Sequence, residues 1–464
     1  MRPHQKSDLT GRWGSPALAL AALLAGAAAL RLVGIGHGLP YPLLNPDEES
    51  IVPRAWEMVH GGGLDPSWYD YPSFVLELLA PFQLGLDEPS YLAGRLVVVA
   101  VGVAGIAAAW WLGARAYGTL AGFVAAAFTA VATTHVAYSR TAVTDVPFTT
   151  LATVSLGLLV TRRLELAGLV AGLATAAKYP GVVLLVPLVV AGYRERRRLA
   201  VAIGLGAVAF AAATPFVVVH AGDAADDARR VAERADEGWL GFENDGSAPV
   251  AFADRLWESL GPALIVAVAG LALAVARRRQ ADLVLASFAL VYFATLLPID
   301  AHFDRYVLPL VPVLGALAGS LRSLAPVTLV LLLVPLAWSV RDTRELTRTD
   351  TREAAQAWLE RRVPSDAPVA ADPSAPPFDR RVVRLELPAP WQEPDARRDL
   401  RRLRAEGVRY VVVSGDVADR VRAAADQYPR EAAFYDELDD SARRVYYQAP
   451  SGRYAGPWVA VYRL

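Results

Sequence analysis

The stretch "SFVLELLAPFQLGL", residues 73–86, decides how this chain is threaded through a membrane. It is apolar, but it is only 14 residues long and contains Glu77 and Pro81. A hydrocarbon core of roughly 30 Å needs about 20 residues of helix to cross it. The stretch is therefore too short to span, and we expect a re-entrant helix or a helix that lies on the membrane surface.

The positive charges of the chain support this interpretation. If residues 73–86 do not cross, every short basic loop falls on the side of the basic N-terminus (Arg2, Lys6 and Arg12), as the positive-inside rule requires. If they did cross, all of these loops would move to the outer face. The loops in question are "ARAYG" at 114–118, Arg162 with Arg163, "YRERRR" at 193–198, "RRRQ" at 277–280, and Arg322.

The rest of the N-terminal three quarters is a series of long apolar runs. The chain has 464 residues, 54% of them hydrophobic, and a mean hydropathy of +0.30, which is typical of a polytopic membrane protein. The first run continues through Leu30 and Arg31, so we interpret it as an uncleaved span. About eleven transmembrane helices are predicted, at 16–35, 93–114, 119–138, 146–161, 164–177, 180–193, 199–219, 260–276, 281–299, 306–320 and 324–340.

These spans divide the chain into three parts. Residues 1–15 form a cytoplasmic N-terminus, and residues 16–341 form the transmembrane domain. Its long outer loops are 36–92 and 220–259, and the second of these could cover a site as a lid. The fold class is thus an α-helical polytopic membrane protein with a C-terminal α/β soluble domain on the outer face, residues 342–464.

The C-terminal domain shows a mixed pattern of strands and helices. Thr349 or Asp350 can cap a first helix, and a second helix, "DARRDLRRLRAEG", should end at Gly407. Five apolar or alternating segments predict strands, without a phosphate-loop or catalytic-triad signature. The segments are "PVAAD", "VVRLEL", "RYVVVS", "RVYYQ" and "WVAVYRL".

Composition also excludes several classes of function. The 46 Lys and Arg balance 47 Asp and Glu, so the formal charge of −1 gives no reason to expect nucleic acid as a partner. The absence of cysteine excludes disulfides, thiolate metal sites and a cysteine nucleophile. No cofactor and no metal site is predicted, although the use of a divalent metal stays open.

The densest acid cluster of the first outer loop lies in "NPDEES", residues 45–50. One interpretation is helix capping, because Asn45 suits the N-cap and the first turn stabilises Asp47 and Glu48 by about 0.3–1 kcal/mol each. The other is catalysis, with a carboxylate acting as a base on an acceptor hydroxyl. The residue spacing leaves both interpretations open.

Further charges lie at the outer ends of the spans. Capping, snorkelling to lipid headgroups or local ion pairing would explain each of them singly. Taken together, acids and isolated cations at a membrane surface suit a base beside cations that hold a lipid-borne phosphate. The residues are Arg140, Asp145, Lys178, His302 and Arg305.

The order of these motifs resembles the C-type glycosyltransferases, and most of all their branch of protein O-mannosyltransferases and lipid A aminoarabinose transferases. The resemblance covers about residues 16–340. It is carried by the Asp47–Glu48 pair, Tyr71–Pro72, "YLAGRLVVVAVG" (91–102), "SRTAVTD" (139–145), "KYPG" (178–181) and "RYVLPLVPVLGALAG" (305–319).

The resemblance implies an integral enzyme of the plasma (inner) membrane that works on its outer face. It would move a hexose or pentose from a polyprenyl-phosphate donor to a hydroxyl of a protein, lipid or glycan acceptor, by an inverting displacement. In that family the acid at Asp47 is the essential one, usually assigned as the base, with Glu48 beside it and Asp145 as the later-loop acid. Residues expected to bind donor phosphate or substrate are Lys178, Arg305, Tyr71, Arg140, His302 and Tyr306.

One position departs from the family pattern. Members often have His or Lys before two prolines where this chain has "DYPSF", residues 70–74. The phosphate contact is therefore expected from Lys178 and Arg305 instead.

Two other classes of protein compete with a transferase. A transporter or lipid flippase for cell-envelope glycan precursors would place ionisable groups near the bilayer midplane, where the chain has few. A surface receptor would do its work in the C-terminal domain and would not need an acid–cation cluster on the spans.

Overall fold

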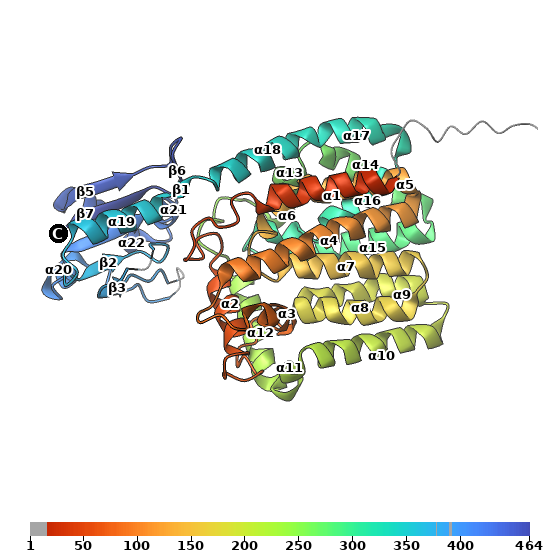
Figure 1. The fold of residues 1–464 in the computed structure, drawn as a ribbon, viewed down its shortest axis with the longest axis horizontal. Coiled ribbons are helices and arrows are strands. Elements are labelled where there is room, and N and C mark those ends of the chain that lie inside the picture. Colours follow the sequence, from red (N-terminus) through yellow and green to blue (C-terminus); the bar gives the residue numbers. More distant parts are fainter. Residues whose placement is uncertain (1–15, 377, 389–391) are drawn as a thin grey trace, which may run out of the picture.

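A computed structural model describes residues 16–376, 378–388 and 392–464. A body of helices makes up most of the molecule, and a smaller α/β domain stands at one end of it (Figure 1). The basic residues Arg2, Lys6 and Arg12 lie outside the described part of the chain.

Each predicted span coincides with one helix or with two consecutive ones. The bundle helices are α1 (Pro16–Leu32), α4 (Tyr91–Tyr117), α5 (Thr119–Val131), α7 (Asp145–Val160), α8 (Leu164–Ala177), α9 (Leu185–Gly192), α10 (Arg196–Ala213), α14 (Ala263–Arg277), α15 (Gln280–Leu296), α16 (Leu310–Gly319), α17 (Ala325–Leu331) and α18 (Leu333–Glu345). In the described part of the chain, two segments, Tyr91–Tyr117 and Arg322–Glu345, are long and apolar enough to cross a membrane by themselves. Helix α13 (Ala248–Leu260) with α14 makes a third if their bend of 117° is counted within one span. Most of the remaining apolar helices, taken together with the 3-10 turns that continue them, have 10–17 residues.

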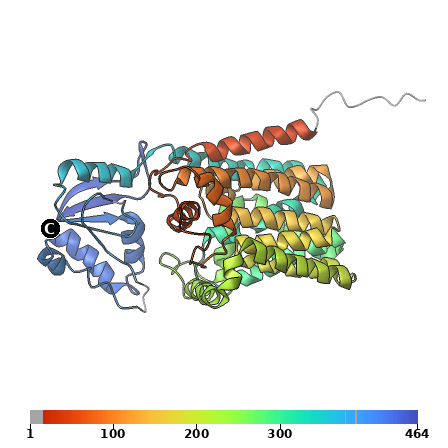
Figure 2. The same cartoon turned by 60° about the horizontal axis from the view of Figure 1, so that its bottom comes forward.

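Residues 73–86 do not run through the bundle. They form α3 (Phe74–Leu79) and a 3-10 turn, η1 (Ala80–Gln83), beside α2 (Asp47–Glu57), at the end of the bundle near the α/β domain (Figures 1 and 2). The side chains of Val75, Leu76 and Leu79 are buried in the core of the helical body, so this short helix is fixed by packing.

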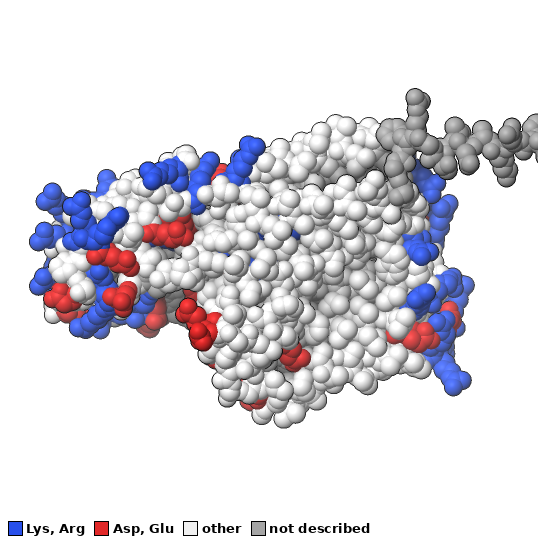
Figure 3. Space-filling view, viewed as in Figure 1, with Lys and Arg blue, Asp and Glu red and all other residues white. Residues whose placement is uncertain are grey.

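The basic loops gather at the opposite end of the bundle. Figure 3 shows Lys and Arg side chains at the end far from the α/β domain. Contacts between these loops also show that they lie side by side, because Arg322 donates a hydrogen bond to the carbonyl of Tyr117 at 2.6 Å. Tyr117 and Arg277 both bond to Asp282, at 2.8 and 2.9 Å. This is the arrangement that the positive-inside argument predicted.

Glycine allows two bundle helices to touch. A Cβ atom on Gly172 of α8 would lie 2.0 Å from the carbonyl oxygen of Gly206 of α10, and one on Gly168 would lie 2.1 Å from that of Ala202. No side chain fits at either position. Small residues therefore bring these two backbones into contact, as is common between helices in membranes.

The C-terminal domain holds a five-stranded sheet in the order β3-β2-β4-β7-β5. Strand β2 is parallel to β3 and β4, whereas β7 is antiparallel to β4 and β5. A short parallel pair, β1 with β6, stands apart. The strands are β1 (Thr349–Asp350), β2 (Val369–Ala371), β3 (Val382–Arg384), β4 (Tyr410–Ser414), β5 (Arg443–Gln448), β6 (Tyr454–Ala455) and β7 (Val459–Arg463), and the helices are α19 (Thr351–Arg362), α20 (Leu400–Ala405), α21 (Gly415–Ala423) and α22 (Pro429–Ser441).

All five predicted strands of this domain form, whereas its helices depart from the prediction in their number and in where they begin. Asp350, one of the two predicted caps, starts α19 by accepting a hydrogen bond from the backbone N–H of Arg352. Helix α20 begins later than predicted, because Asp399 accepts hydrogen bonds from the N–H groups of Arg401 and Arg402 and so caps it there. Helices α21 and α22 were not predicted.

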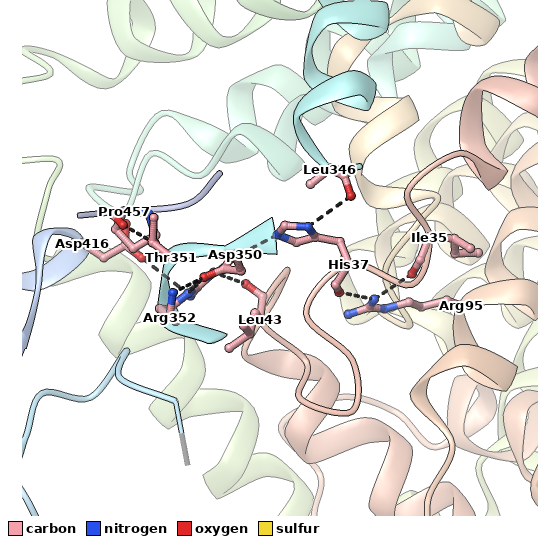
Figure 4. A network of polar contacts seen from close by, with 10 residues as sticks. All are labelled: Ile35, His37, Leu43, Arg95, Leu346, Asp350, Thr351, Arg352, Asp416 and Pro457. Carbon is pink, nitrogen blue, oxygen red and sulfur yellow. Dashed lines mark hydrogen bonds and ion pairs between the residues drawn. The ribbon is translucent and has the colours of Figure 1, made fainter. Parts of the chain in front are cut away.

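A buried polar network joins the α/β domain to the first loop of the helical body (Figure 4). Asp350 bonds to the imidazole of His37 at 3.1 Å and to the guanidinium of Arg352 at 2.8 Å, and Arg352 also donates to the carbonyl of Leu43. Burial would raise the pKa of Asp350, but the hydrogen bonds from Arg352 and His37 outweigh it and bring the pKa to about 2. The carboxylate is therefore charged at neutral pH, and the domain is held against residues 37–43.

Candidate active site

Asp47 is the first residue of α2, but its carboxylate does not cap this helix. The side-chain oxygen of Asn45 accepts the hydrogen bond from the backbone N–H of Asp47, at 2.9 Å. The Asp47 carboxylate is thus free for other partners, and it bonds to the guanidinium of Arg305 at 2.5 Å and to the hydroxyl of Tyr71 at 3.1 Å. Its side chain is 25% exposed, so a ligand can reach it.

A second ion pair lies beside the first. The ammonium group of Lys178, at the C-cap of α8, contacts the carboxylate of Asp145 at 2.5 Å. The same ammonium lies 5.9 Å from the ring of Tyr71 and 5.3 Å from that of Tyr306, within cation–π range. The two rings therefore stand between the two ion pairs.

Five distant segments thus build one group of six side chains, which we call the acid–cation cluster. Its members come from α2, the loop before α3, the start of α7, the end of α8 and the 3-10 turn η3 (Asp304–Val307). They are Asp47, Tyr71, Asp145, Lys178, Arg305 and Tyr306.

Burial shifts the pKa values of two members of the cluster, Lys178 and Tyr71. Burial lowers the pKa of Lys178, and the neighbouring Asp145 carboxylate opposes that shift. Burial also raises the pKa of Tyr71 well above its ordinary value, so that its hydroxyl stays protonated as a donor. Two carboxylates, two cations and two phenols give a site that can bind an anion and can also accept a proton.

Glu48, the other predicted acid, lies outside this cluster. Its fully buried carboxylate binds the guanidinium of Arg95 with two hydrogen bonds, of 2.9 and 2.8 Å, and accepts the backbone N–H of Ala142 at 2.8 Å. Arg95 also donates to the carbonyls of Ile35 and His37. Adjacent residues of a helix point in different directions, so Glu48 faces the protein interior, and its contacts indicate a structural role instead of the catalytic one expected from the sequence.

We expect loss of the buried ion pair between Glu48 and Arg95 to destabilise the folded protein. Arg95→Leu leaves the Glu48 carboxylate buried without its partner, which should destabilise the protein by about 3–5 kcal/mol. Thermal unfolding of the detergent-solubilised protein measures the effect. The control is Arg198→Leu, which breaks the exposed pair with Glu165 and should leave the unfolding temperature nearly unchanged. Equal losses in the two variants would contradict the structural assignment.

Two further predicted residues, Arg140 and His302, also lie apart from the cluster. The guanidinium of Arg140 bonds to the carbonyl of Leu30 and to the hydroxyl of Thr343, so it ties α1 to α18. The imidazole of His302 is buried edge-on against Phe242 and Phe252, and it faces the loop after α12 (Ala221–Asp236). Their distant partners could not be read from sequence spacing.

Sequence reasoning missed one supporting residue, Tyr138. Its hydroxyl donates a hydrogen bond of 2.6 Å to Asp304, at the start of the turn that carries Arg305. The contact joins α6 (Thr133–Tyr138) to η3, which are 166 residues apart in the chain. No spacing signal points to such a pair.

Among the described residues, no group of three or more His, Asp or Glu side chains is arranged to hold a metal ion. The acid–cation cluster pairs each of its carboxylates with a cation instead.

Solved structures with the same architecture identify the class of the fold. ArnT from Cupriavidus metallidurans in the apo state is 16% identical, with a TM-score of 0.61 over 96% of this chain and 98% of that one. ArnT bound to undecaprenyl phosphate is 15% identical, with a TM-score of 0.57 over 96% and 97%. The oligosaccharyltransferase of Archaeoglobus fulgidus in the apo form is 12% identical, with a TM-score of 0.60 over 95% and 74%. The chain has the fold of the C-type glycosyltransferases.

A family model matches about half of the chain. Residues 68–298 match the model of glycosyltransferase family 87. Among curated protein sequences, none matches the chain. The fold and this partial family match together support a multi-pass membrane glycosyltransferase, the class that the sequence motifs predicted.

Proposed function

We propose that this protein transfers a sugar from a polyprenyl-phosphate donor to an acceptor hydroxyl, with Asp47 as the base. The observation that carries the proposal is the Asp47 carboxylate held between Arg305 and Tyr71, next to the Lys178–Asp145 pair. Two structural neighbours support the donor class. One is ArnT bound to undecaprenyl phosphate, and the other is the archaeal oligosaccharyltransferase in complex with an inhibitory peptide and a dolichol-phosphate.

The cations of the cluster suit the donor phosphate. Arg305 offers a planar fork of N–H donors, whereas Lys178 is a compact point charge. As the bond between the sugar and the phosphate oxygen breaks, negative charge grows on the phosphate, and both cations stabilise it. The protonated hydroxyl of Tyr71 adds a donor beside them.

The carboxylates suit the acceptor side of the reaction. When Arg305 binds phosphate, its hold on Asp47 weakens, and Asp47 can take the proton of the acceptor hydroxyl. The acceptor oxygen then attacks the anomeric carbon from the side opposite the phosphate, so the configuration inverts and polyprenyl phosphate leaves. Asp145 orients Lys178 and touches no reacting atom in this scheme.

The position of the basic loops supports the sidedness of the proposal. Lys and Arg in short loops mark the cytoplasmic side of membrane proteins, and the short basic loops of the helical body lie at its end far from the α/β domain (Figure 3). The α/β domain has basic residues of its own, but the rule does not apply to a whole domain. The acid–cation cluster and the α/β domain would then lie on the outer face of the plasma membrane.

Single cysteines test this orientation cleanly, because the chain has none of its own. Cysteines at the exposed positions Asn244 and Ser451 should react with an impermeant thiol reagent in intact cells. Cysteines at Glu195 and Gln280 should react only after the cells are permeabilised. Labelling of Glu195→Cys in intact cells would reverse the proposed orientation.

The donor and the sugar are tested with purified protein. We expect one member of a panel of polyprenyl-phosphate hexoses and pentoses to give a glycosylated product, and mass spectrometry of that product names the sugar. The panel should be offered with peptide, lipid and glycan acceptors. Transfer from nucleotide sugars alone would contradict the proposed donor class.

A further inference from the structure

A cleft of about 810 Å³ separates the α/β domain from the end of the helical body. One wall is the segment that follows α12, with Glu237, Trp239 and Phe242, together with Asp300 and His302. Leu240 of the same segment packs into the core of the α/β domain beside Leu385 and Val417, and so closes one side of the cleft. The polar network of Figure 4 reaches this cleft too, because Arg352 lies 3.8 Å from Asp416, a residue of its lining.

The opposite wall lies at the carboxyl ends of the parallel strands. The residues that line it come directly after β2, β3 and β4, and include Pro373, Glu386 and Asp416. In open α/β sheets, ligands bind in the crevice outside the carboxyl ends of the strands. The topology of the domain therefore places a ligand crevice where the helical body faces it.

The cleft also adjoins the acid–cation cluster. The ring of Phe303 packs against Phe242 of the cleft wall, with centroids 4.9 Å apart, and it lies 4.8 Å from the guanidinium of Arg305. A molecule held in the cleft would thus lie one aromatic ring away from the residue that we assign to the donor phosphate.

The lining of the cleft indicates the kind of molecule that it would hold. Among the residues that the structure describes, it has three aromatic side chains, of which Trp239 is 53% exposed. It also has five carboxylates and two guanidinium groups, an excess of negative charge that disfavours an anionic ligand. Flat apolar rings suit the C–H faces of sugar rings, and carboxylates accept hydrogen bonds from hydroxyls. The groups are Trp239, Phe242 and Tyr428, with Glu237, Glu243, Asp300, Glu386 and Asp416, and Arg384 with Arg420.

We infer that this cleft binds a neutral saccharide portion of the acceptor, and the inference rests on the proposed transferase function. Trp239 stacks on a sugar ring, and the carboxylates around it hold hydroxyl groups. The hydroxyl group of the bound acceptor that receives the new sugar extends past Phe303 toward Asp47.

Binding of saccharides without donor tests the inference. The probes are neutral oligosaccharides of glucose, mannose, galactose or arabinose, titrated into the purified full-length protein by calorimetry. We expect at least one to bind, and Trp239→Ala to weaken its binding by about tenfold or more, the equivalent of about 1.4 kcal/mol. The control is Trp257→Ala, which removes a similarly exposed tryptophan of α13 outside the cleft and should leave binding unchanged.

Three outcomes would overturn the inference. They are the absence of binding by every saccharide up to about 10 mM, equal binding by Trp239→Ala and wild type, and binding of a peptide instead of a saccharide in the cleft. Asp47→Asn separates this test from the proposed function, because it should bind the saccharide as wild type does. If transfer fails with every donor while Trp239-dependent saccharide binding persists, the cleft remains a saccharide site, but the proposed function and the acceptor role of the saccharide are both lost.

Discussion

Asp47→Asn is expected to yield a folded, membrane-inserted protein that still binds its donor but transfers almost no sugar. Asparagine keeps the shape of the side chain and can still accept a hydrogen bond from Arg305, but it lacks the basic carboxylate. General-base catalysis of about 10²–10⁴-fold should therefore disappear. The measurement is the rate of sugar transfer at saturating donor, together with donor binding by the same preparation.

Glu49→Gln is the matched control for this substitution. Glu49 lies on the same helix, two residues further on, and it is exposed outside the acid–cation cluster. Its neutralisation should leave the rate nearly unchanged. If Asp47→Asn turned over as fast as Glu49→Gln, Asp47 would not be the base.

Loss of the two cations should act on the donor. Lys178→Met and Arg305→Gln each remove a charge-assisted contact to phosphate, worth about 1.5–3 kcal/mol, so donor affinity should fall by about 10–100-fold in each variant. Titration with a polyprenyl-phosphate sugar measures it.

Arg230→Gln serves as the control for this pair. Arg230 is an exposed cation of α12 that pairs with Asp227 and contacts no member of the cluster, and its loss should leave donor affinity unchanged. Unaltered donor affinity in both Lys178→Met and Arg305→Gln would contradict the assignment of the phosphate site.

The predicted spans and strands were recoverable from sequence because long apolar runs and alternating segments record burial directly. Two helices of the α/β domain, α21 and α22, were missed. Their buried residues follow a helical spacing, as Phe434, Tyr435 and Leu438 do in "PREAAFYDELDD", but charged residues separate these apolar positions into pieces too short to stand out in the sequence.

Some of the predicted site residues meet in the structure, and others do not. Asp47, Asp145, Lys178 and Arg305 stood at the expected end of the bundle, and the structure joins them in two ion pairs. The structure separates Glu48 from the other predicted acids, because sequence gives the position of a residue on a helix but not its partner, which is Arg95, 47 residues away. The contacts of Arg140 and His302 are long-range for the same reason.

The alternative of a transporter is less well supported by this geometry. The two ion pairs of the cluster lie at the end of the bundle, beside α2 and η3. Transport sites, in contrast, lie near the bilayer midplane and are typically formed by broken helices. A site at a membrane surface suits a reaction between a lipid-borne donor and an acceptor outside the bilayer.

The most direct test of the account follows the lipid product of the reaction. Purified wild-type protein is incubated with a labelled polyprenyl-phosphate sugar and an acceptor, and the released lipid is identified. We predict polyprenyl monophosphate, formed in a one-to-one ratio with glycosylated acceptor of inverted anomeric configuration, and nearly none from Asp47→Asn. Release of polyprenyl monophosphate by Asp47→Asn at the wild-type rate, or a glycosylated product of retained anomeric configuration, would contradict the account.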